Sequence, residues 1–342
     1  MSDSPKRRSP LVADRRHARK PAAKPAPKRA KPARRRAPAR RKTSRNPVVR
    51  LFRAVFGWVF GLIWRIVWRL TAVVALLVVG AAVYFMAGLP EVSALVDGRA
   101  RGSVTLLDTD GAVFAWRGEQ FGGMITADTV SPHLKNAVVA TEDKRFYWHP
   151  GIDPRGIASA IRINLSEGRG PLSGHGGSTI TQQTAKLLCL GVPYDPDKWD
   201  SEAAYEADCR EGSLWRKVKE ATYALGMELK YTKDEILTIY LNRAFLGAGA
   251  RGFEAASQRY FGKSAADVGP AEAAMLAGLL TAPTRYAPTN NLQRSQDRAA
   301  VIVGLMEEQG YLSPAEAQQA RARPAVLWKR QSGARAGISP TG

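Results

Sequence analysis

Residues 142–151 read EDKRFYWHPG, and this stretch is the starting point for interpreting the rest of the chain. Two adjacent acids, Glu142 and Asp143, precede three aromatic residues and a Pro-Gly turn. Aromatic neighbours can withdraw a carboxylate from water, which raises its pKa and makes it a better base. The stretch therefore predicts a partly desolvated carboxylate at the lip of a cleft, although the same composition is also typical of a surface helix end.

The second informative stretch, residues 176–186, reads GGSTITQQTAK. Its glycines lead into a helix start, where Thr179 and Gln182 have the spacing of a capping box. The free N–H groups and partial positive charge of a helix N-terminus suit an anionic ligand. Lys186 follows Gln182 by four residues, so it shares that helix face and can contact the same anion. A plain capped helix is the alternative.

Two helical stretches follow. Residues 216–220 (RKVKE) place Arg216 and Glu220 on one helix face, an arrangement that contributes little when it is exposed. Residues 233–242 (KDEILTIYLN) carry a buried apolar stripe that Asn242 ends. Neither stretch indicates a function alone, but the order and spacing of all the stretches do.

The rest of the pattern is mainly helical. Asp153 and Pro154 are typical of a helix start, and apolar residues then recur at four-residue spacing up to Gly168. Residues 104–107 and 112–116 flank an Asp-Gly turn and predict a short β-hairpin. The glycine-rich residues 168–177 are expected to be mobile. Further helices are predicted at residues 179–188, 214–230, 233–241, 271–280 and 293–309.

The charge of the chain lies mostly in its N-terminal tail. The 342 residues include 51 Lys and Arg against 30 Asp and Glu, a net charge of +21. Residues 1–50 hold 19 of the basic residues, two acids and eight prolines, so this tail carries +17 and is predicted to be disordered. The remainder carries only +4, which argues against a basic nucleic-acid-binding core, and no nucleic acid is expected as a partner.

An apolar segment separates the tail from the motifs. Residues 70–89 form an uncharged run, LTAVVALLVVGAAVYFMAGL, which as a helix spans about 30 Å, the thickness of a bilayer core. A cleaved signal peptide has a shorter run. We predict a juxtamembrane segment and transmembrane helix over residues 51–89, with the tail in the cytoplasm and the later residues outside it. A buried soluble helix is the alternative.

The five ordered stretches, with residues 298–302 (RAAVI) as the last, resemble the motifs of the peptidoglycan glycosyltransferases. This family is the polymerase module of class A penicillin-binding proteins and of monofunctional transglycosylases. The resemblance runs from about residue 104 to 311 and implies a mainly α, lysozyme-like helical domain with a small β-hairpin. We expect this domain at residues 90–325, followed by a C-terminal tail at 326–342.

The resemblance also implies a reaction. Family members join lipid II units to a growing glycan strand through β-1,4 linkages, with inversion and release of a lipid pyrophosphate. By motif match, Glu142 would be the general base and Glu220 would orient the substrate, while Lys186 and Arg216 would hold the pyrophosphate. The substrate-binding candidates are Asp143, Phe146, His149, Thr179, Gln182, Gln183, Lys186, Arg216, Lys217, Asn242 and Arg298. Of these, Lys217, Asn242 and Arg298 are expected to serve mainly as scaffold.

The sequence departs from the family pattern in a few places. Leu187 stands where the family commonly has Asn, and Thr238 where it commonly has Glu. Residues 189–209 form a longer acidic connection than usual, bracketed by Cys189 and Cys209. In an oxidising periplasm these two cysteines can form a disulfide worth about 3 kcal/mol, and two buried free thiols are the alternative.

No cofactor is required by this interpretation. His149 has no second histidine at helical spacing, so no metal site is predicted, although Mg²⁺ or Mn²⁺ would help neutralise a pyrophosphate. The inner membrane and cell-wall synthesis or division proteins are the other candidate partners. A Lys-Thr-Gly motif is absent, so no transpeptidase domain is expected, and the chain is either monofunctional or part of a bifunctional protein. A lysozyme-like glycan hydrolase and a non-catalytic envelope scaffold are the competing functions.

Overall fold

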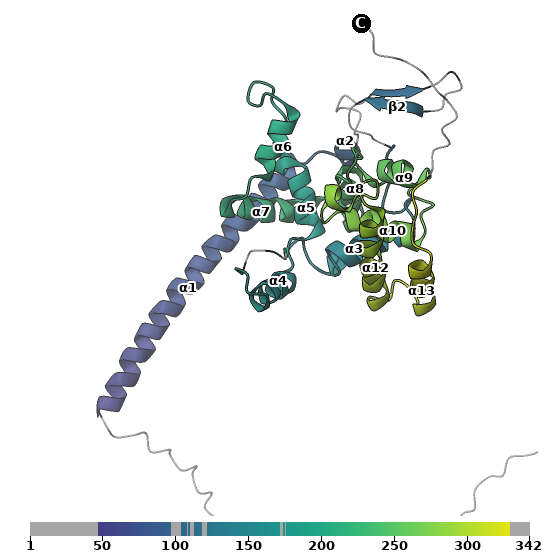
Figure 1. Cartoon of the computed structure of the whole chain (residues 1–342). Coiled ribbons are helices and arrows are strands. Elements are labelled where there is room, and N and C mark those ends of the chain that lie inside the picture. The colour runs from purple at the N-terminus through teal and green to yellow at the C-terminus, as the bar shows by residue number, and fades with distance from the viewer. Residues whose placement is uncertain are drawn as a thin grey trace, which may run out of the picture. The chain divides into compact units, whose positions relative to one another are not determined.

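A computed structural model describes residues 47–96, 104–107, 109, 113–117, 122–171, 174 and 176–328 of this chain (Figure 1). Within these ranges the protein consists of helices and one two-stranded sheet, which confirms the mainly α prediction. The chain divides into two compact units, residues 1–65 and residues 66–342. Of the first unit, residues 47–65 are described, and all of them are helical.

The apolar segment forms helix α1 (Pro47–Gly88), which has 42 residues. The helix is therefore longer than the uncharged run of residues 70–89, and residues 47–50, which were predicted to be part of the disordered tail, are helical. The physical reason is that proline is favoured in the first turn of a helix and no proline follows before Pro90. Among the described residues, α1 is the one helix long and apolar enough to cross a bilayer, and its most apolar stretch is almost wholly exposed.

The C-terminal end of α1 packs on helix α7 (Leu214–Lys230) in the second unit. Gly226 allows this close approach, because a Cβ atom there would lie 2.8 Å from the carbonyl oxygen of Ala82. The rings of Phe85 and Tyr223 also meet, with centroids 5.2 Å apart. The Tyr231 hydroxyl donates to the Pro90 carbonyl at 2.5 Å, so the chain is held to this unit where it leaves α1.

A short helix, α2 (Val92–Val96), leads to the predicted hairpin. Strands β1 (Val104–Leu107) and β2 (Val113–Arg117) pair antiparallel, with an irregularity between Leu106 and Leu107. Several predicted features lie outside the described residues. They are the Asp-Gly turn at residues 110–111, residues 1–46 of the tail, residues 329–342, and residues 172, 173 and 175 of the glycine-rich stretch.

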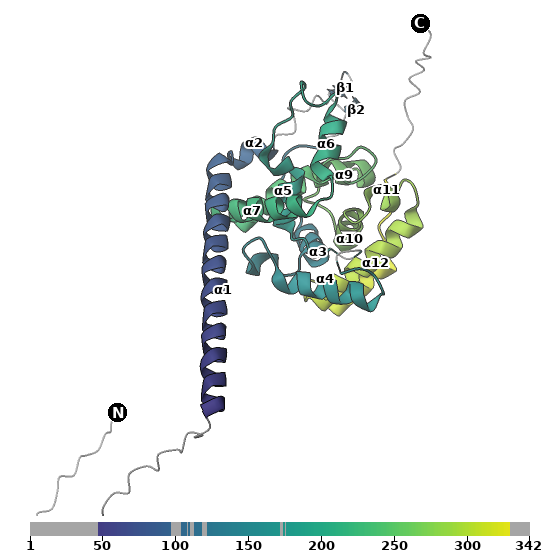
Figure 2. The same cartoon turned by 90° about the vertical axis from the view of Figure 1, so that its left-hand side faces the viewer.

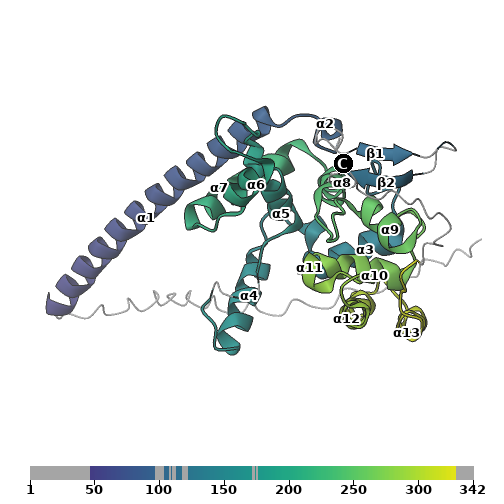
Figure 3. The ribbon, with the colours of Figure 1, turned by 45° about the horizontal axis from the view of Figure 1, so that its top comes forward.

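One group of helices surrounds α10 (Pro270–Leu279), which packs against α3 (Pro132–Glu142) and α12 (Leu292–Glu308). Figure 3 shows α10, α12 and α13 (Pro314–Ala322) side by side. Helices α8 (Lys233–Arg243), α9 (Phe253–Phe261) and α11 (Pro283–Tyr286) complete this group. Its interior is mostly apolar, with Leu134, Ile236, Phe253, Leu276 and Ile302 inaccessible to solvent.

A second group of helices carries the other motifs. It comprises α4 (Pro154–Ser166), α5 (Ile180–Leu187), α6 (Glu202–Arg210) and α7. Helix α5 packs against both α7 and α8, and so connects the two groups. Figure 2 shows α5 beside α7. The 3₁₀ turns η2 (Phe146–Trp148) and η3 (Cys189–Gly191) lie in the connections.

The predicted helices agree with α4, α5, α7, α8, α10 and α12 to within about two residues. The sequence pattern predicts none of α3, α6, α9 and α13. The C-terminal tail was predicted to start at residue 326, but Trp328 still belongs to the folded unit, because its backbone N–H donates to the Tyr260 carbonyl at 2.8 Å.

Candidate active site

Glu142 is the last residue of α3, and its carboxylate is partly buried. The side chain of Gln183 on α5 donates from Nε2 to Oε2 of Glu142 at 2.8 Å. Burial raises the pKa of Glu142 above its usual value, while this hydrogen bond and the charge of Arg298 partly oppose the rise. A carboxylate with a raised pKa is well suited to accept a proton near neutral pH.

Gln183 is itself held by a second hydrogen bond. Tyr240, on α8, donates from its hydroxyl to Oε1 of Gln183 at 3.1 Å. Burial and the neighbouring charge of Glu142 raise the pKa of Tyr240 well above 10, so its hydroxyl stays protonated. Three helices thus contribute one chain of side chains that ends at Glu142.

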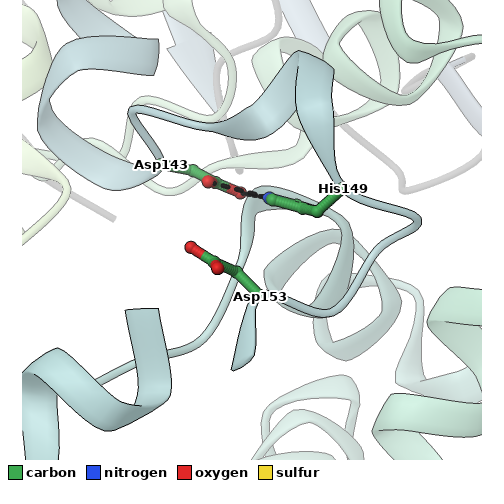
Figure 4. A group of neighbouring side chains, drawn as sticks. All are labelled: Asp143, His149 and Asp153. Atoms are coloured by element: carbon green, nitrogen blue, oxygen red, sulfur yellow. Dashed lines mark hydrogen bonds and ion pairs between the residues drawn. The ribbon is translucent and has the colours of Figure 1, made fainter. Parts of the chain in front are cut away.

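Asp143 follows Glu142 and is buried, and it joins the first motif to the start of α5. Its carboxylate accepts from the backbone N–H of Ile180 at 3.0 Å, and Nε2 of His149 lies 3.0 Å from both of its oxygens (Figure 4). The Thr179 hydroxyl donates to the Gly151 carbonyl at 2.6 Å. The first two motifs are therefore locked together by buried hydrogen bonds.

Thr179 and Gln182 were predicted to contact substrate, but both side chains are buried and form the capping box of α5. Phe146 is likewise inaccessible, with Lys233 Nζ 4.6 Å from its ring centroid. Asn242 is buried and bonds the backbone of Ile125 and Thr238. In this structure these side chains are therefore packed within the fold.

Asp143, His149 and Asp153 are, among the described residues, the one group of His, Cys, Asp and Glu close enough to hold a metal ion. Their ligand atoms lie within 4.8 Å of one another (Figure 4). However, Arg145 donates to Asp153 from Nη2 at 2.5 Å and from Nε at 2.9 Å. Burial alone would raise the pKa of Asp153, but these bonds hold it below its usual value. The group is therefore better described as an ion pair, Arg145 with Asp153, beside a hydrogen-bonded pair, His149 with Asp143, than as a cation site.

Lys186, Arg216, Lys217 and Glu220 form a charged cluster at the other end of α5. Glu220 is 1% exposed and accepts from Arg216 Nη1 at 3.1 Å and from Lys217 Nζ at 2.7 Å. Burial lowers the pKa of Lys186, and the charge of Arg216 lowers it further, against the opposing charge of Glu220. Three cations meet a single carboxylate here, so the cluster has an excess of positive charge.

The guanidinium of Arg216 is not fully used by the protein. Its Nε atom is buried and has no hydrogen-bond partner, although Nη1 bonds Glu220. An unpaired buried donor is costly, and an anion would satisfy it. Lys186 lies three residues after Gln183 on α5, so the cation cluster and the Glu142 side of the site share one helix face.

Arg298, on α12, contributes charge rather than a direct bond to Glu142. Its Nη2 donates to the Thr281 hydroxyl at 2.9 Å, and its positive charge lowers the pKa of Glu142. Its Nε is also buried without a partner. The expectation that Arg298 is mainly scaffold misses this electrostatic effect, because sequence distance hides it.

The sequence gives no sign of a role in the site for two further residues, Tyr240 and Thr238, beyond their place in an apolar helix stripe. Tyr240 holds Gln183, as described above. Thr238 stands where the family commonly has Glu. Its side chain is buried, and its hydroxyl oxygen accepts from the backbone N–H of Ala127 at 2.9 Å.

The acidic connection between Lys186 and Arg216 is a small folded insert. A disulfide joins Cys189 to Cys209, with Cα atoms 5.2 Å apart. Trp199 and Tyr205 pack beside it in a separate small core, with ring centroids 5.0 Å apart. The insert is tied to the rest of the domain by the ion pair between Arg251 and Glu206.

Comparison with known proteins identifies related sequences. The family model described as Transglycosylase matches residues 110–307. Penicillin-binding protein 1A of Aquifex aeolicus is 38% identical over 222 residues, which cover 65% of this chain and 28% of that protein. Penicillin-binding protein 1A of Escherichia coli is 36% identical over 238 residues, which cover 70% of this chain and 26% of that protein. The chain thus spans about a quarter of the length of these relatives.

Solved structures are also similar, among them the crystal structure of penicillin-binding protein 1A from Haemophilus influenzae. The match has a TM-score of 0.37 and 22% sequence identity, and it covers 68% of this chain and 22% of that chain.

Proposed function

The chain belongs to the transglycosylase family, and from this premise we propose that it polymerises peptidoglycan by joining lipid II units into β-1,4-linked glycan strands. The observation that carries the proposal is the shared face of α5. At one position Gln183 holds a carboxylate of raised pKa, and one turn later Lys186 joins a cluster with excess positive charge. A base and an anion site side by side suit the displacement of a pyrophosphate by a hydroxyl.

Glu142 acts as the general base. It accepts the proton of the acceptor 4-hydroxyl while that oxygen forms a bond to C1 of the donor sugar, and the bond from C1 to the pyrophosphate oxygen breaks. Attack opposite to the leaving group inverts the configuration at C1. Because burial raises the pKa of Glu142, its basicity is better matched to neutral pH than that of a solvated glutamate.

Lys186 and Arg216 stabilise the departing lipid pyrophosphate. Arg216 offers an unpaired buried Nε–H, and Lys186 supplies a point charge. Glu220 is occupied by Arg216 and Lys217, so its role is to orient these cations rather than to donate a proton. A pyrophosphate leaves more easily than a sugar alkoxide, so a general acid is dispensable.

No resident cofactor is part of this proposal. In the group of Asp143, His149 and Asp153, the two carboxylates already have partners: Asp153 pairs with Arg145, and Asp143 is hydrogen-bonded to His149. A divalent cation such as Mg²⁺ or Mn²⁺ would instead enter on the pyrophosphate and add to the charge of Lys186 and Arg216.

The proposed location is the inner membrane, crossed once by α1, with the N-terminus cytoplasmic and the catalytic unit periplasmic. The +17 charge of residues 1–50 supports this orientation, since basic segments stay on the cytoplasmic side. The disulfide supports an oxidising compartment for the catalytic unit. Proteins of cell-wall synthesis or division are proposed partners.

The test is a polymerisation assay with purified full chain and lipid II, read on a gel that separates glycan strands by length. Wild type should yield polymer, and Glu142→Gln should abolish it. Glu308→Gln is the matched control, because Glu308 is exposed at the end of α12 and should tolerate the same change. Shortening of preformed strands would indicate a hydrolase, and no reaction on either substrate a scaffold. Unimpaired polymerisation by Glu142→Gln would remove Glu142 as the base.

A further inference from the structure

We propose that Tyr240 is a positioning residue for the reaction, because its hydroxyl holds the Gln183 amide in the orientation that presents an N–H to Glu142. The inference rests on the proposed function, in which Glu142 is the base. It assigns a task to a side chain that the sequence places in an apolar helix stripe.

The contacts run in one line across three helices. Tyr240 is 2% exposed at the centre of α8, and its hydroxyl bonds Oε1 of Gln183 at 3.1 Å. The other end of the same amide, Nε2, bonds Glu142 Oε2 at 2.8 Å. Among the described residues, Gln183 is the one hydrogen-bond partner of this hydroxyl.

The orientation of the amide matters because its two ends are chemically opposite. An ionised carboxylate only accepts hydrogen bonds, so a flipped Gln183 would set its carbonyl oxygen against Glu142. The flip would also take away the acceptor of the buried Tyr240 proton, and a buried donor without an acceptor is costly. Tyr240 therefore penalises the flipped amide, and it does so without touching Glu142 or substrate.

The charged and titratable groups that face Glu142 are Asp143 beside it in the chain, Arg298 from α12, and Tyr240 behind Gln183. Asp143 disfavours the ionised base, and Arg298 favours it. Gln183 is uncharged, so its effect on the base depends entirely on which end it presents. That dependence makes Tyr240 a control on the protonation of Glu142.

The test is Tyr240→Phe, which removes the hydroxyl and keeps the ring. We expect the polymerisation rate at saturating lipid II to fall by up to about tenfold at pH values below the acidic limb, with little change in KM. Loss of a correctly oriented donor disfavours the ionised base, so the acidic limb of the pH profile should move to higher pH by roughly one unit. Raising the pH should then restore much of the rate.

Tyr260→Phe is the matched control for a lost buried hydroxyl. Tyr260, on α9, is also fully buried, but its hydroxyl donates at 2.9 Å to the carbonyl of Leu246, in the connection between α8 and α9. This variant should lose stability to a similar degree and keep the wild-type pH profile. A Tyr240→Phe variant whose rate falls without movement of the acidic limb would overturn the proposal and leave Tyr240 a packing residue.

A double-mutant cycle that combines Tyr240→Phe with Gln183→Leu tests whether Tyr240 acts on Glu142 through Gln183. With Gln183 absent, Tyr240→Phe should cause no further shift of the acidic limb. Equal shifts with and without Gln183 would show that Tyr240 acts by another route and would refute the inference.

A second readout separates this inference from the proposed function. Because the pKa of Glu142 is raised in the folded state, the unfolding free energy of wild type should fall relative to Glu142→Gln as pH rises through that pKa. In a Tyr240→Phe background this fall should extend to higher pH. If wild type polymerises nothing, the proposed function fails, whereas an unchanged fall in the Tyr240→Phe background contradicts the hydrogen-bond linkage itself.

Discussion

Removal of the disulfide in the insert between α5 and α7 should weaken both the fold and the reaction. Cys189 lies three residues after Lys186, and Cys209 lies seven residues before Arg216. The bridge therefore shortens the free path between the two cations proposed to hold pyrophosphate. The perturbation is the double replacement Cys189→Ser with Cys209→Ser, which avoids leaving one reactive thiol.

The magnitude follows from the length of the loop that the bridge closes. The two cysteines are 20 residues apart. In the chain-entropy treatment, a loop of this length restricts the unfolded chain by about 11 cal/mol/K, or about 3 kcal/mol at 25 °C. Trp199 and Tyr205 remain in place beside the bridge, so their packing is retained in the variant and the loss should stay close to this entropic value.

The assay is urea unfolding of the full chain in detergent, followed by circular dichroism, together with polymerisation of lipid II. We expect the double variant to lose about 3 kcal/mol of unfolding free energy and about tenfold in rate, since small displacements of positioning groups are costly in catalysis. A dithiol reductant should bring wild type to the same behaviour and leave the double variant unchanged, which serves as the control.

An unfolding free energy within about 0.5 kcal/mol of wild type would refute the entropic argument, because the bridge would then not restrict the unfolded chain as calculated. A large loss of stability with full polymerisation activity would refute the link to Lys186 and Arg216, and would leave the bridge as a fold stabiliser alone.

Three other outcomes are expected. Lys186→Ala should lower the polymerisation rate at least tenfold, because it weakens stabilisation of the pyrophosphate. Lys219→Ala, at an exposed position of α7, should leave the rate unchanged and serves as the control. A Lys186→Ala effect confined to lipid affinity would contradict the proposed role of Lys186. Thr238→Val should cost about 1–3 kcal/mol of unfolding free energy, because the buried N–H of Ala127 loses its acceptor; equal stability in chemical denaturation would contradict that bond. The polymerisation rate should rise with pH as Glu142 ionises, with the acidic limb above the usual glutamate value of 4.5, since burial raises this pKa; a limb at or below 4.5 would exclude Glu142 as its source.

Local signals allowed much of the helical structure to be predicted. The Thr179 and Gln182 capping box, the Asp153 cap and the bounds of α7 depend on residues within four positions of one another, and the structure has all three. The same holds for Arg216 and Glu220, whose contact needs only one turn of helix. These features follow from helix geometry, so they can be predicted without knowledge of the tertiary contacts.

The uncharged run covers residues 70–89, but the helix that contains it is longer. The arginines in residues 51–69 interrupt the apolar pattern, and charged residues do not end a helix. Helix α1 therefore begins at Pro47, where proline at the first position is favourable. Charge predicts where a helix meets the membrane surface, and it says little about where the backbone stops being helical.

The sequence by itself determined the long apolar segment, the helix caps, the residue types in the motifs, and the pairing of Arg216 with Glu220. Only the tertiary structure decided which of these side chains stay accessible and which are buried in the fold. Glu142 and Gln183 are 41 positions apart, and Gln183 and Tyr240 are 57 apart, so both contacts exist because α5 packs against α8 close to the end of α3. Periodicity within a helix defines a face, but burial by neighbouring helices determines what that face can do.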